Sequence, residues 1–368
     1  MADQQQTQPA SESVSTTGRT ATQPAMQPEA EASTVAEEAM AAGDDTDASS
    51  LGGLSTDDSQ ASLRSSILDY RRENGRTYHR LSDGKYVIPN DELEQERLDI
   101  ANHLWMLTWD GKFCLCPKNE GAKRVLDVGT GTGIWALDYA DEHPESTVMG
   151  VDLSPIQPSF VPPNCFFEVD DVEKEWTWSE PFDFIFSRNM AGSLQDWRGF
   201  VAQAFEHLEP GGYFEVHDNL YPIECDDGTL KEDSALFQWS KYLVEATDKI
   251  GRPITIASQI PKILEDAGFE DVVVTKQKMP ASPWAKDPKL RELGIWTQAS
   301  LLPGIEGLCL ALFTRILDWQ PAEVLVFCAN VRKDARNLGI HAYWYGYSIY
   351  GRKPFPKEET PDQDSRSA

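Results

Sequence analysis

The spacing of apolar positions changes repeatedly from residue 124 onward, and each change predicts a strand or a helix. Short runs rich in Val, Ile, Phe and Met predict strands, and apolar residues three and four apart predict helices. The predicted strands are 125–128, 147–152, 166–169, 182–186, 213–216, 272–275 and 341–350, and the predicted helices are 134–140, 197–208, 260–267 and 321–336. Because strands that alternate with helices build sheets covered on both faces, the sequence predicts an α/β fold with a mostly parallel, seven-stranded sheet.

Other stretches lie outside this alternation. Residues 220–255 and 281–318 do not fit a minimal sheet, and we expect them to be helical insertions that cover a pocket. Upstream, the apolar spacing predicts a helix that Asp91 caps and Gly111 ends.

Composition separates a tail from the foldable chain. The first 60 residues contain eleven acidic residues, one basic residue (Arg19) and no Trp, Tyr, Phe or Ile. Such a segment cannot bury enough apolar surface to offset its ordering entropy, so 1–60 is expected to be a disordered acidic tail. We expect one large domain over 63–352 and a second disordered tail over 353–368.

Charge and cysteine content exclude several classes of protein. The net charge of −27 argues against direct binding to nucleic acid, whose phosphate backbone is also anionic. No stretch approaches about 18 uninterrupted apolar residues and no signal-peptide pattern opens the chain, so neither a membrane span nor secretion is expected. Six cysteines are too few for a disulfide scaffold, which favours a soluble, intracellular protein. Cys114 and Cys116 have no matching second pair, so no metal site is expected.

The most specific local pattern is Asp127-Val-Gly129-Thr-Gly131-Thr-Gly133, between a predicted strand and a predicted helix. Glycines permit positive φ and close approach of a ligand to the backbone, and the N-terminus of the helix attracts an anionic group. Asp152 ends the next strand, where a carboxylate can accept hydrogen bonds from both hydroxyls of a ribose. The pattern therefore predicts a nucleoside site at the switch point of the sheet.

Spacing and charge select among nucleosides. The dinucleotide fingerprint G-x-G-x-x-G is one residue longer than the pattern here, and a carboxylate at Asp127 would repel a pyrophosphate. The same carboxylate can instead attract an α-ammonium group or organise the loop, which favours S-adenosylmethionine. After the third predicted strand, Asp171 or its neighbour Asp170 is placed to accept a hydrogen bond from an adenine amino group.

In this order the signals resemble the class I methyltransferases that use S-adenosylmethionine, a family in which a turn like Leu208-Glu-Pro-Gly-Gly212 precedes the fifth strand. More narrowly, the chain is similar to the LaeA-like fungal branch, which contains regulators of secondary metabolism and their relatives. The narrower resemblance rests on the stretches ENGRTY (73–78), YVIPND (86–91), SLQDW (193–197) and 152–176. It covers 63–352 and implies a Rossmann-like methyltransferase domain. Its implied parts are an N-terminal lid or helical extension (63–120), a cofactor-binding half (121–219) and a substrate-side half with helical insertions (220–352).

The crossover between the second and third strands differs from the helix common in class I enzymes. Residues 155–163 contain four prolines, a density that forbids a helix interior. We therefore expect an extended loop, as in the narrower branch, with Ile156 and Gln157 in the wall of the cofactor pocket.

The resemblance also implies contacts to the cofactor. The expected cofactor-binding residues are Asp127, Gly129, Thr130, Gly131, Gly133, Asp152, Leu153, Asp170, Asp171, Val172, Arg188 and Tyr78. The segment 63–110 is expected to close over the cofactor, with Tyr78 or Arg80 near its amino-acid end. The sulfonium cation favours aromatic faces, for which Tyr78, Trp135 and Trp197 are candidates.

The implied reaction is an in-line methyl transfer, in which the protein positions two reactants and excludes water. A base is needed only when the acceptor loses a proton. His217 and Asp218 end the fifth predicted strand and are the first candidates for that base. Arg188, after the fourth strand, is a candidate contact to the substrate.

Three functions remain open at this point. The first is a methyltransferase acting on a small molecule or a protein, linked to fungal secondary metabolism. The second is a LaeA-like nuclear regulatory protein that acts through protein partners with little or no acceptor methylation. The third is an NAD-dependent oxidoreductase, which the glycine spacing disfavours. No run of five or more basic residues marks nuclear import, so nucleus and cytoplasm both stay open.

Overall fold

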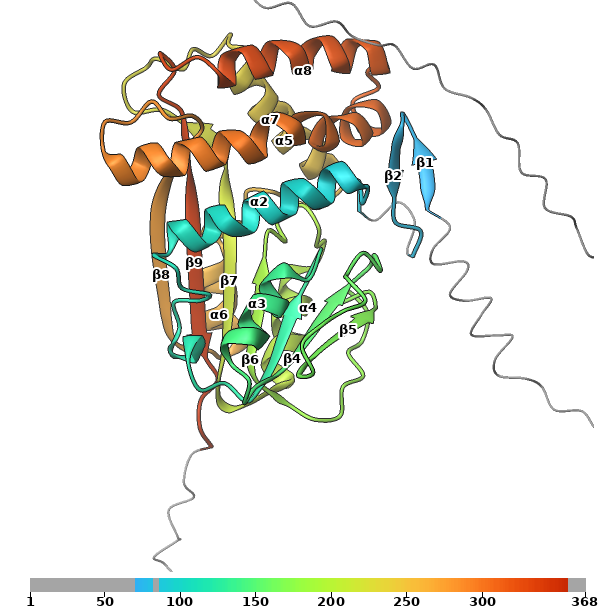
Figure 1. Cartoon of the computed structure of the whole chain (residues 1–368), viewed down its shortest axis with the longest axis vertical. Coiled ribbons are helices and arrows are strands. Elements are labelled where there is room, and N and C mark those ends of the chain that lie inside the picture. Colours follow the sequence, from blue (N-terminus) through green and yellow to red (C-terminus); the bar gives the residue numbers. More distant parts are fainter. Residues whose placement is uncertain (1–69, 82–85, 357–368) are drawn as a thin grey trace, which may run out of the picture. The chain divides into compact units, whose positions relative to one another are not determined.

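The computed structural model describes residues 70–81 and 86–356 (Figure 1). Seven strands form one sheet in the order β5-β4-β3-β6-β7-β9-β8. They are β3 (Arg124–Val128), β4 (Thr147–Asp152), β5 (Cys165–Val169), β6 (Phe182–Arg188), β7 (Leu208–Glu224), β8 (Glu270–Pro280) and β9 (Tyr343–Arg352). Strands β3 to β7 pair in parallel, and β9 runs antiparallel to both its neighbours. The predicted seven-stranded, mostly parallel sheet is confirmed.

Disordered tails were predicted at 1–60 and 353–368. The whole of 1–60 lies outside the described residues, and so does 353–368 except for 353–356.

Helices cover both faces of the sheet because its central strands are apolar on both sides. Val125 and Phe184 pack with α3 (Ile134–Glu142). Their strand neighbours Leu126 and Ile185 point to the other face, which α4 (Trp197–Glu206) and α6 (Ile260–Ala267) cover. The alternation follows from the two-residue period of a strand.

Strands β7 and β8 are longer than the runs 213–216 and 272–275 that the sequence predicts. Residues 220–224, expected at the start of a helical insertion, instead continue β7 and pair with β9, for example Leu220 with Tyr345. The β9 partner supplies the backbone hydrogen bonds that extend both neighbours. The expected helical insertion therefore begins later, with α5 (Ala235–Lys249), whose N-cap Ser234 accepts a hydrogen bond from Phe237 N.

A group of helices lies beyond the carboxyl edge of the parallel strands (Figure 1). It contains α2 (Glu92–Thr108), α5, α7 (Pro288–Ile316) and α8 (Pro321–Ala335), which pack on one another. By length and composition α7 qualifies as a membrane-spanning helix. Its Ile305, Cys309 and Phe313 are fully buried in a core shared with α5 and α8, so packing inside the protein accounts for its apolar composition.

Shorter elements complete the chain. The prediction that Asp91 caps a helix is confirmed, because its carboxylate accepts a hydrogen bond from Glu94 N. Ahead of it, β1 (Arg71–Glu73) and β2 (Arg76–Tyr78) form a hairpin that we did not predict, although its Asn-Gly turn is a strong hairpin signal. The crossover at 153–164 contains no helix, as expected. Two 3-10 helices, η1 (Pro117–Asn119) and η2 (Ile256–Ser258), lie in connections.

Candidate functional site

A cavity of about 290 Å³ lies at the carboxyl edge of the sheet. Its walls come from the ends of strands β3 to β7, from Trp344 of β9, and from helices α2, α5 and α7. The size is at the lower end of the range of ligand pockets, about 300–1,000 Å³. Strand ends of this kind are where open α/β sheets place their ligands.

The glycine loop after β3 is fixed by hydrogen bonds before any ligand arrives. Gly131 N donates to Asp152 Oδ2 at 2.9 Å, and Thr130 Oγ1 donates to Asp127 Oδ2 at 2.6 Å. Gly129 has φ of +71°, and a side chain there would collide with Met190. Gly129, Thr130 and Gly131 line the cavity, so the loop presents its backbone to it.

Three residues expected at the cofactor pocket lie outside the cavity wall. Gly133, with φ of +81°, is the N-cap of α3 and is not part of the cavity wall. Gln157 is not in the wall either, because its side chain donates to Gly131 O at 2.7 Å and to Ser154 O at 3.0 Å. Ile156, the other residue expected in the wall, is also absent from it. Apart from Leu153, the extended crossover thus supports the loop rather than lining the cavity.

Carboxylates from successive strand ends meet in the cavity. Asp127, Asp152, Asp170 and Asp171 all line it, together with Leu153 and Val172. Burial raises the pKa of Asp127 and of Asp152 to about 6. Asp171 is 3% exposed, whereas Asp170 is exposed and accepts a hydrogen bond from Asp171 N. The buried Asp171 is therefore the better placed of the two to contact a ligand inside the cavity.

Arg188 brings a positive charge to the same cavity from the end of β6. Its Nη2 donates to Asn102 Oδ1 at 2.7 Å, and Asn102 in turn donates to Asp138. Burial lowers the pKa of Arg188 to about 10, although nearby Asp127 and Asp138 act in the opposite direction. A guanidinium held by a neutral amide at a cavity wall is suited to an anionic group of a ligand.

Only one of the two candidate bases, Asp218, reaches the cavity. Asp218 lines the cavity, and its carboxylate accepts hydrogen bonds from Ala191 N at 2.7 Å and Asn219 N at 2.9 Å. Burial raises the pKa of Asp218 to about 7. His217 points to the face of β7 opposite to Asp218, where Trp105 and Trp109 of α2 cover it, and it is not part of the wall.

His217 is instead enclosed in the protein core. Its Nε2 lies 2.6 Å from Glu215 Oε1, and its ring stacks on Trp105 with 5.6 Å between ring centroids. Burial lowers the pKa of His217, which keeps the ring neutral. The expectation that His217 serves as a base is therefore corrected: the structure gives it no access to the cavity.

The N-terminal segment contributes different residues from those expected. Tyr78 is not part of the wall, because its ring packs under the Arg315 guanidinium at 4.9 Å. Arg80 is also absent from the wall, whereas Tyr86, Val87 and Ile88 line it. Among the aromatic candidates for the sulfonium, Trp135 lines the cavity, whereas Trp197, the first residue of α4, lies in the core.

Several cavity residues were missed by sequence reasoning. They are Tyr86, Asn102, Asn219, Tyr221 and Trp344. Asn219 follows Asp218 at the same strand end, which is a signal that was present. Trp344 belongs to an aromatic run on β9 with no local mark of its role.

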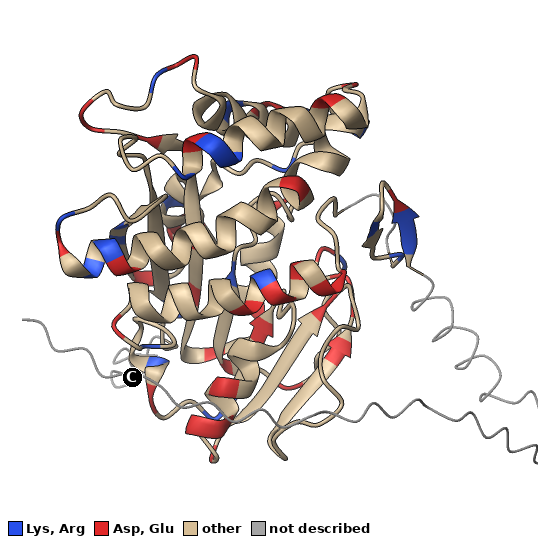
Figure 2. Cartoon of the chain, turned by 45° about the horizontal axis from the view of Figure 1, so that its top comes forward, with Lys and Arg blue, Asp and Glu red and all other residues tan. Residues whose placement is uncertain are grey.

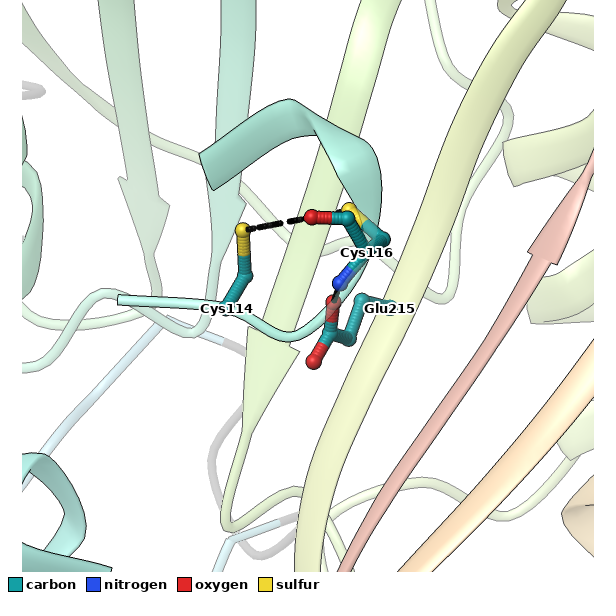
Figure 3. Close-up of side chains that lie close together, drawn as sticks. All are labelled: Cys114, Cys116 and Glu215. Atoms are coloured by element: carbon teal, nitrogen blue, oxygen red, sulfur yellow. Dashed lines mark hydrogen bonds between the residues drawn. The ribbon is translucent and has the colours of Figure 1, made fainter. Parts of the chain in front are cut away.

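One group of potential metal ligands occurs in the described ranges 70–81 and 86–356 (Figure 3). The ligand atoms of Cys114, Cys116 and Glu215 lie within 4.8 Å of one another. Glu215 already accepts hydrogen bonds from Leu115 N, Cys116 N, His217 and Ser348. Burial raises the pKa of both thiols, which keeps them protonated. We interpret the group as a structural junction that ties 113–119 to β7 and β9.

Acidic and basic residues are spread over the helices, strands and loops of the described part of the chain (Figure 2). The first 60 residues account for −10 of the net charge of −27, so −17 lies in the rest of the chain.

Known proteins resemble this chain over most of its length. Residues 110–274 match the family described as a methyltransferase domain. Methyltransferase pytC of Aspergillus terreus is 41% identical over 303 residues, which is 82% of this chain and 94% of pytC. The secondary metabolism regulator laeA of Aspergillus flavus is 37% identical over 288 residues, which is 77% of this chain and 78% of laeA.

Among solved structures, a phosphoethanolamine N-methyltransferase 2 of Haemonchus contortus matches with a TM-score of 0.44 and 17% identity, over 82% of this chain and 75% of that one. The sheet order, the glycine loop and the identity to pytC and laeA lead to one assignment. The chain belongs to the S-adenosylmethionine-dependent methyltransferase family that includes pytC and the laeA regulators of fungal secondary metabolism.

Proposed function

We propose that the chain transfers a methyl group from S-adenosylmethionine to a small, largely apolar acceptor that binds in the same cavity. The observation that carries this proposal is the composition of the far end of the cavity. That end is lined by Leu243, Ile254, Met279, Leu301, Leu308 and Leu312, from α5, β8, α7 and the loop after α5. An apolar wall of this extent favours an apolar ligand over a charged peptide segment.

Strand order separates the two ends of the cavity. The acids Asp152 and Asp171 follow β4 and β5, whereas Trp344 lies on β9. Four strand spacings separate β4 from β9, which is about 19 Å at about 4.8 Å each. The acidic end is therefore assigned to the cofactor, and the end beyond β6 to the acceptor.

The residues of this chain fit the cofactor. Asp152 would accept hydrogen bonds from the ribose hydroxyls, Asp171 from the adenine amino group, and Arg188 would bind the carboxylate of the methionine part. When bound, S-adenosylmethionine supplies a methyl group on a positively charged sulfur. The glycine loop, already hydrogen-bonded to Asp152, places its backbone against the ligand.

Asp218 is the group that we assign to proton removal from the acceptor. It stands at the carboxyl end of the parallel part of β7, one residue after the partner of Arg188 in the sheet, between the two ends of the cavity. A carboxylate whose pKa is near 7 can accept a proton at neutral pH and release it again. An acceptor without an acidic proton would not need this residue.

The test combines binding with product detection. Calorimetry of the full chain should show S-adenosylhomocysteine binding, and incubation with labelled S-adenosylmethionine should transfer label to the fraction of a fungal extract below about 1 kDa, the small-molecule range. Label in the protein fraction alone would contradict a small-molecule acceptor. No binding of S-adenosylhomocysteine would contradict the cofactor assignment.

A regulatory role is the second candidate, and the similarity to laeA of Aspergillus flavus favours it. In that case protein partners would bind outside the cavity, and deletion of the gene would change transcripts of many gene clusters without a missing methylated metabolite. All six cysteines are free thiols, which supports a reducing, intracellular compartment for either role.

A further inference from the structure

Two residues in the wall of the cavity each carry a buried side-chain atom that has no hydrogen-bond partner. The indole N–H of Trp344 and the side-chain oxygen of Asn219 are both buried and both unpaired. Both residues line the cavity, and Trp344 is only 5% exposed. A buried polar group without a partner destabilises the protein, so each of these atoms gains a partner when a polar group of a ligand reaches it.

The two atoms share one face of the sheet. Asn219 pairs with Gly346 of β9, and Trp344 lies two residues from Gly346, so all three side-chain positions point to the same side. Tyr221, two residues after Asn219, points there as well, and its ring centroid lies 5.9 Å from that of Trp344. The polar positions are therefore gathered on one face of the sheet, and the cavity wall also contains apolar residues of α5 and α7.

The unpaired atoms have opposite hydrogen-bonding character. An indole N–H only donates, so its partner must be an oxygen or nitrogen with a free lone pair. The oxygen of Asn219 only accepts, so its partner must carry a hydrogen on oxygen or nitrogen. Asp152, which ends β4, is three strand spacings from Asn219 on β7 and four from Trp344 on β9, or about 14 and 19 Å, so both residues lie on the acceptor side of the cavity.

We propose that Trp344 and Asn219 recognise an acceptor that combines an apolar body with a carbonyl oxygen and a hydroxyl group. The carbonyl accepts a hydrogen bond from Trp344, and the hydroxyl donates one to Asn219. This inference rests on the proposed function and specifies the chemical class of its acceptor. Residues of this kind reject analogues that lack the polar group, because the buried protein atom is then left unpaired.

The test uses pairs of probes that differ in one function. On the full chain saturated with S-adenosylhomocysteine, calorimetry compares 2-acetylnaphthalene with 2-isopropenylnaphthalene for the carbonyl, and 2-naphthol with 2-methylnaphthalene for the hydroxyl. Each oxygen compound should bind about five- to tenfold more tightly than its apolar counterpart, as one buried hydrogen bond predicts. Because each probe carries only one polar group, the comparison does not depend on the distance between Trp344 and Asn219.

Variants assign each preference to one residue. Trp344→Phe should remove the preference for the acetyl compound and leave that for naphthol, and Asn219→Leu should do the reverse. Trp109→Phe is the matched control, because Trp109 is also 5% exposed with an unpaired indole N–H but is not part of the cavity wall.

The proposal is overturned if Trp344→Phe leaves the carbonyl preference intact, if Trp109→Phe removes it equally, or if no probe binds the loaded protein. Failure of S-adenosylhomocysteine to bind at all would instead refute the proposed function, so the two failures are distinguishable.

Discussion

Replacement of Asp152 by alanine tests the cofactor end of the cavity, because that one carboxylate is assigned both ribose hydroxyls. It is held in place by Gly131 N and Ser154 N, each at 2.9 Å. A hydrogen bond to a charged group contributes about 1.5–3 kcal/mol, and water that enters the vacated space recovers part of the loss. We expect a net loss of about 1–3 kcal/mol, or about five- to 150-fold weaker binding of S-adenosylhomocysteine.

Calorimetry of the wild type and the Asp152→Ala variant measures this change directly. Asp196→Ala is the control, because the exposed Asp196 carboxylate also accepts a backbone hydrogen bond, from Gly199 N at 2.9 Å, but lies outside the cavity wall. Thermal melting of both variants reports any loss of folded protein. A change of less than about twofold in a folded Asp152→Ala variant, well below the value of one hydrogen bond, would refute the reasoning.

Other predictions concern pH, the N-terminal segment, the core and the glycine loop. Burial raises the pKa of Asp152 to about 6, and ribose hydroxyls bind its ionised form. The affinity for S-adenosylhomocysteine, measured by calorimetry, should therefore be constant above about pH 7 and fall below about pH 6. Equal affinity in these two pH ranges would contradict this. Deletion of 1–60 should leave that affinity intact, whereas deletion of 1–90 should abolish it, because Tyr86, Val87 and Ile88 line the cavity; equal affinity in both truncations contradicts the lid. Glu215→Gln should lower the free energy of unfolding in urea by roughly 3 kcal/mol, since several buried donors lose a charged acceptor; a loss below about 1 kcal/mol would argue against the junction. Gly129→Ala should weaken cofactor binding at least tenfold, because its side chain would displace Met190 from the cavity wall; unchanged binding would show that the loop tolerates the shift.

The residues at the proposed cofactor end could be predicted to meet because their signals are local in the sequence. The glycine loop joins β3 directly to α3, and Asp152 is the last residue of β4, so strand and helix boundaries alone bring them together. The same locality explains why an acid after β5 could be proposed from the sequence, although burial was needed to prefer Asp171 over Asp170.

The choice between His217 and Asp218 shows where local reasoning ends. Both residues end the same predicted strand, and the two-residue period of a strand places their side chains on opposite faces of the sheet. Which of them reaches the cavity depends on the packing of α2 against that face, where Trp105 and Trp109 enclose His217. A contact more than 100 residues apart in the chain leaves no mark in the spacing around 217.

The acceptor end was not predictable for the same physical reason. Its walls come from α2, α5, α7, β8 and β9, which meet only after the sheet has formed. The extension of β7 to Glu224 was missed because it depends on pairing with β9, whose sequence lies more than 100 residues downstream. Periodicity located these elements but carried no information on which of their faces would meet.

Unpaired polar atoms identify a ligand contact only in combination with a cavity. Trp109, Trp197 and Tyr78 also carry buried polar atoms without partners, yet none of them lines the cavity. In those three residues the large apolar ring is buried in the core, and the gain from its burial, of order 2 kcal/mol, offsets one missing hydrogen bond. The same gain would hold Trp344 and its unpaired N–H in place without any ligand, so stability data cannot separate the two explanations. Only the cavity distinguishes the two explanations, because Trp344 and Asn219 stand in its wall and Trp109 does not. Packing alone does not produce a preference for the carbonyl compound that disappears in the Trp344→Phe variant but persists in the Trp109→Phe variant.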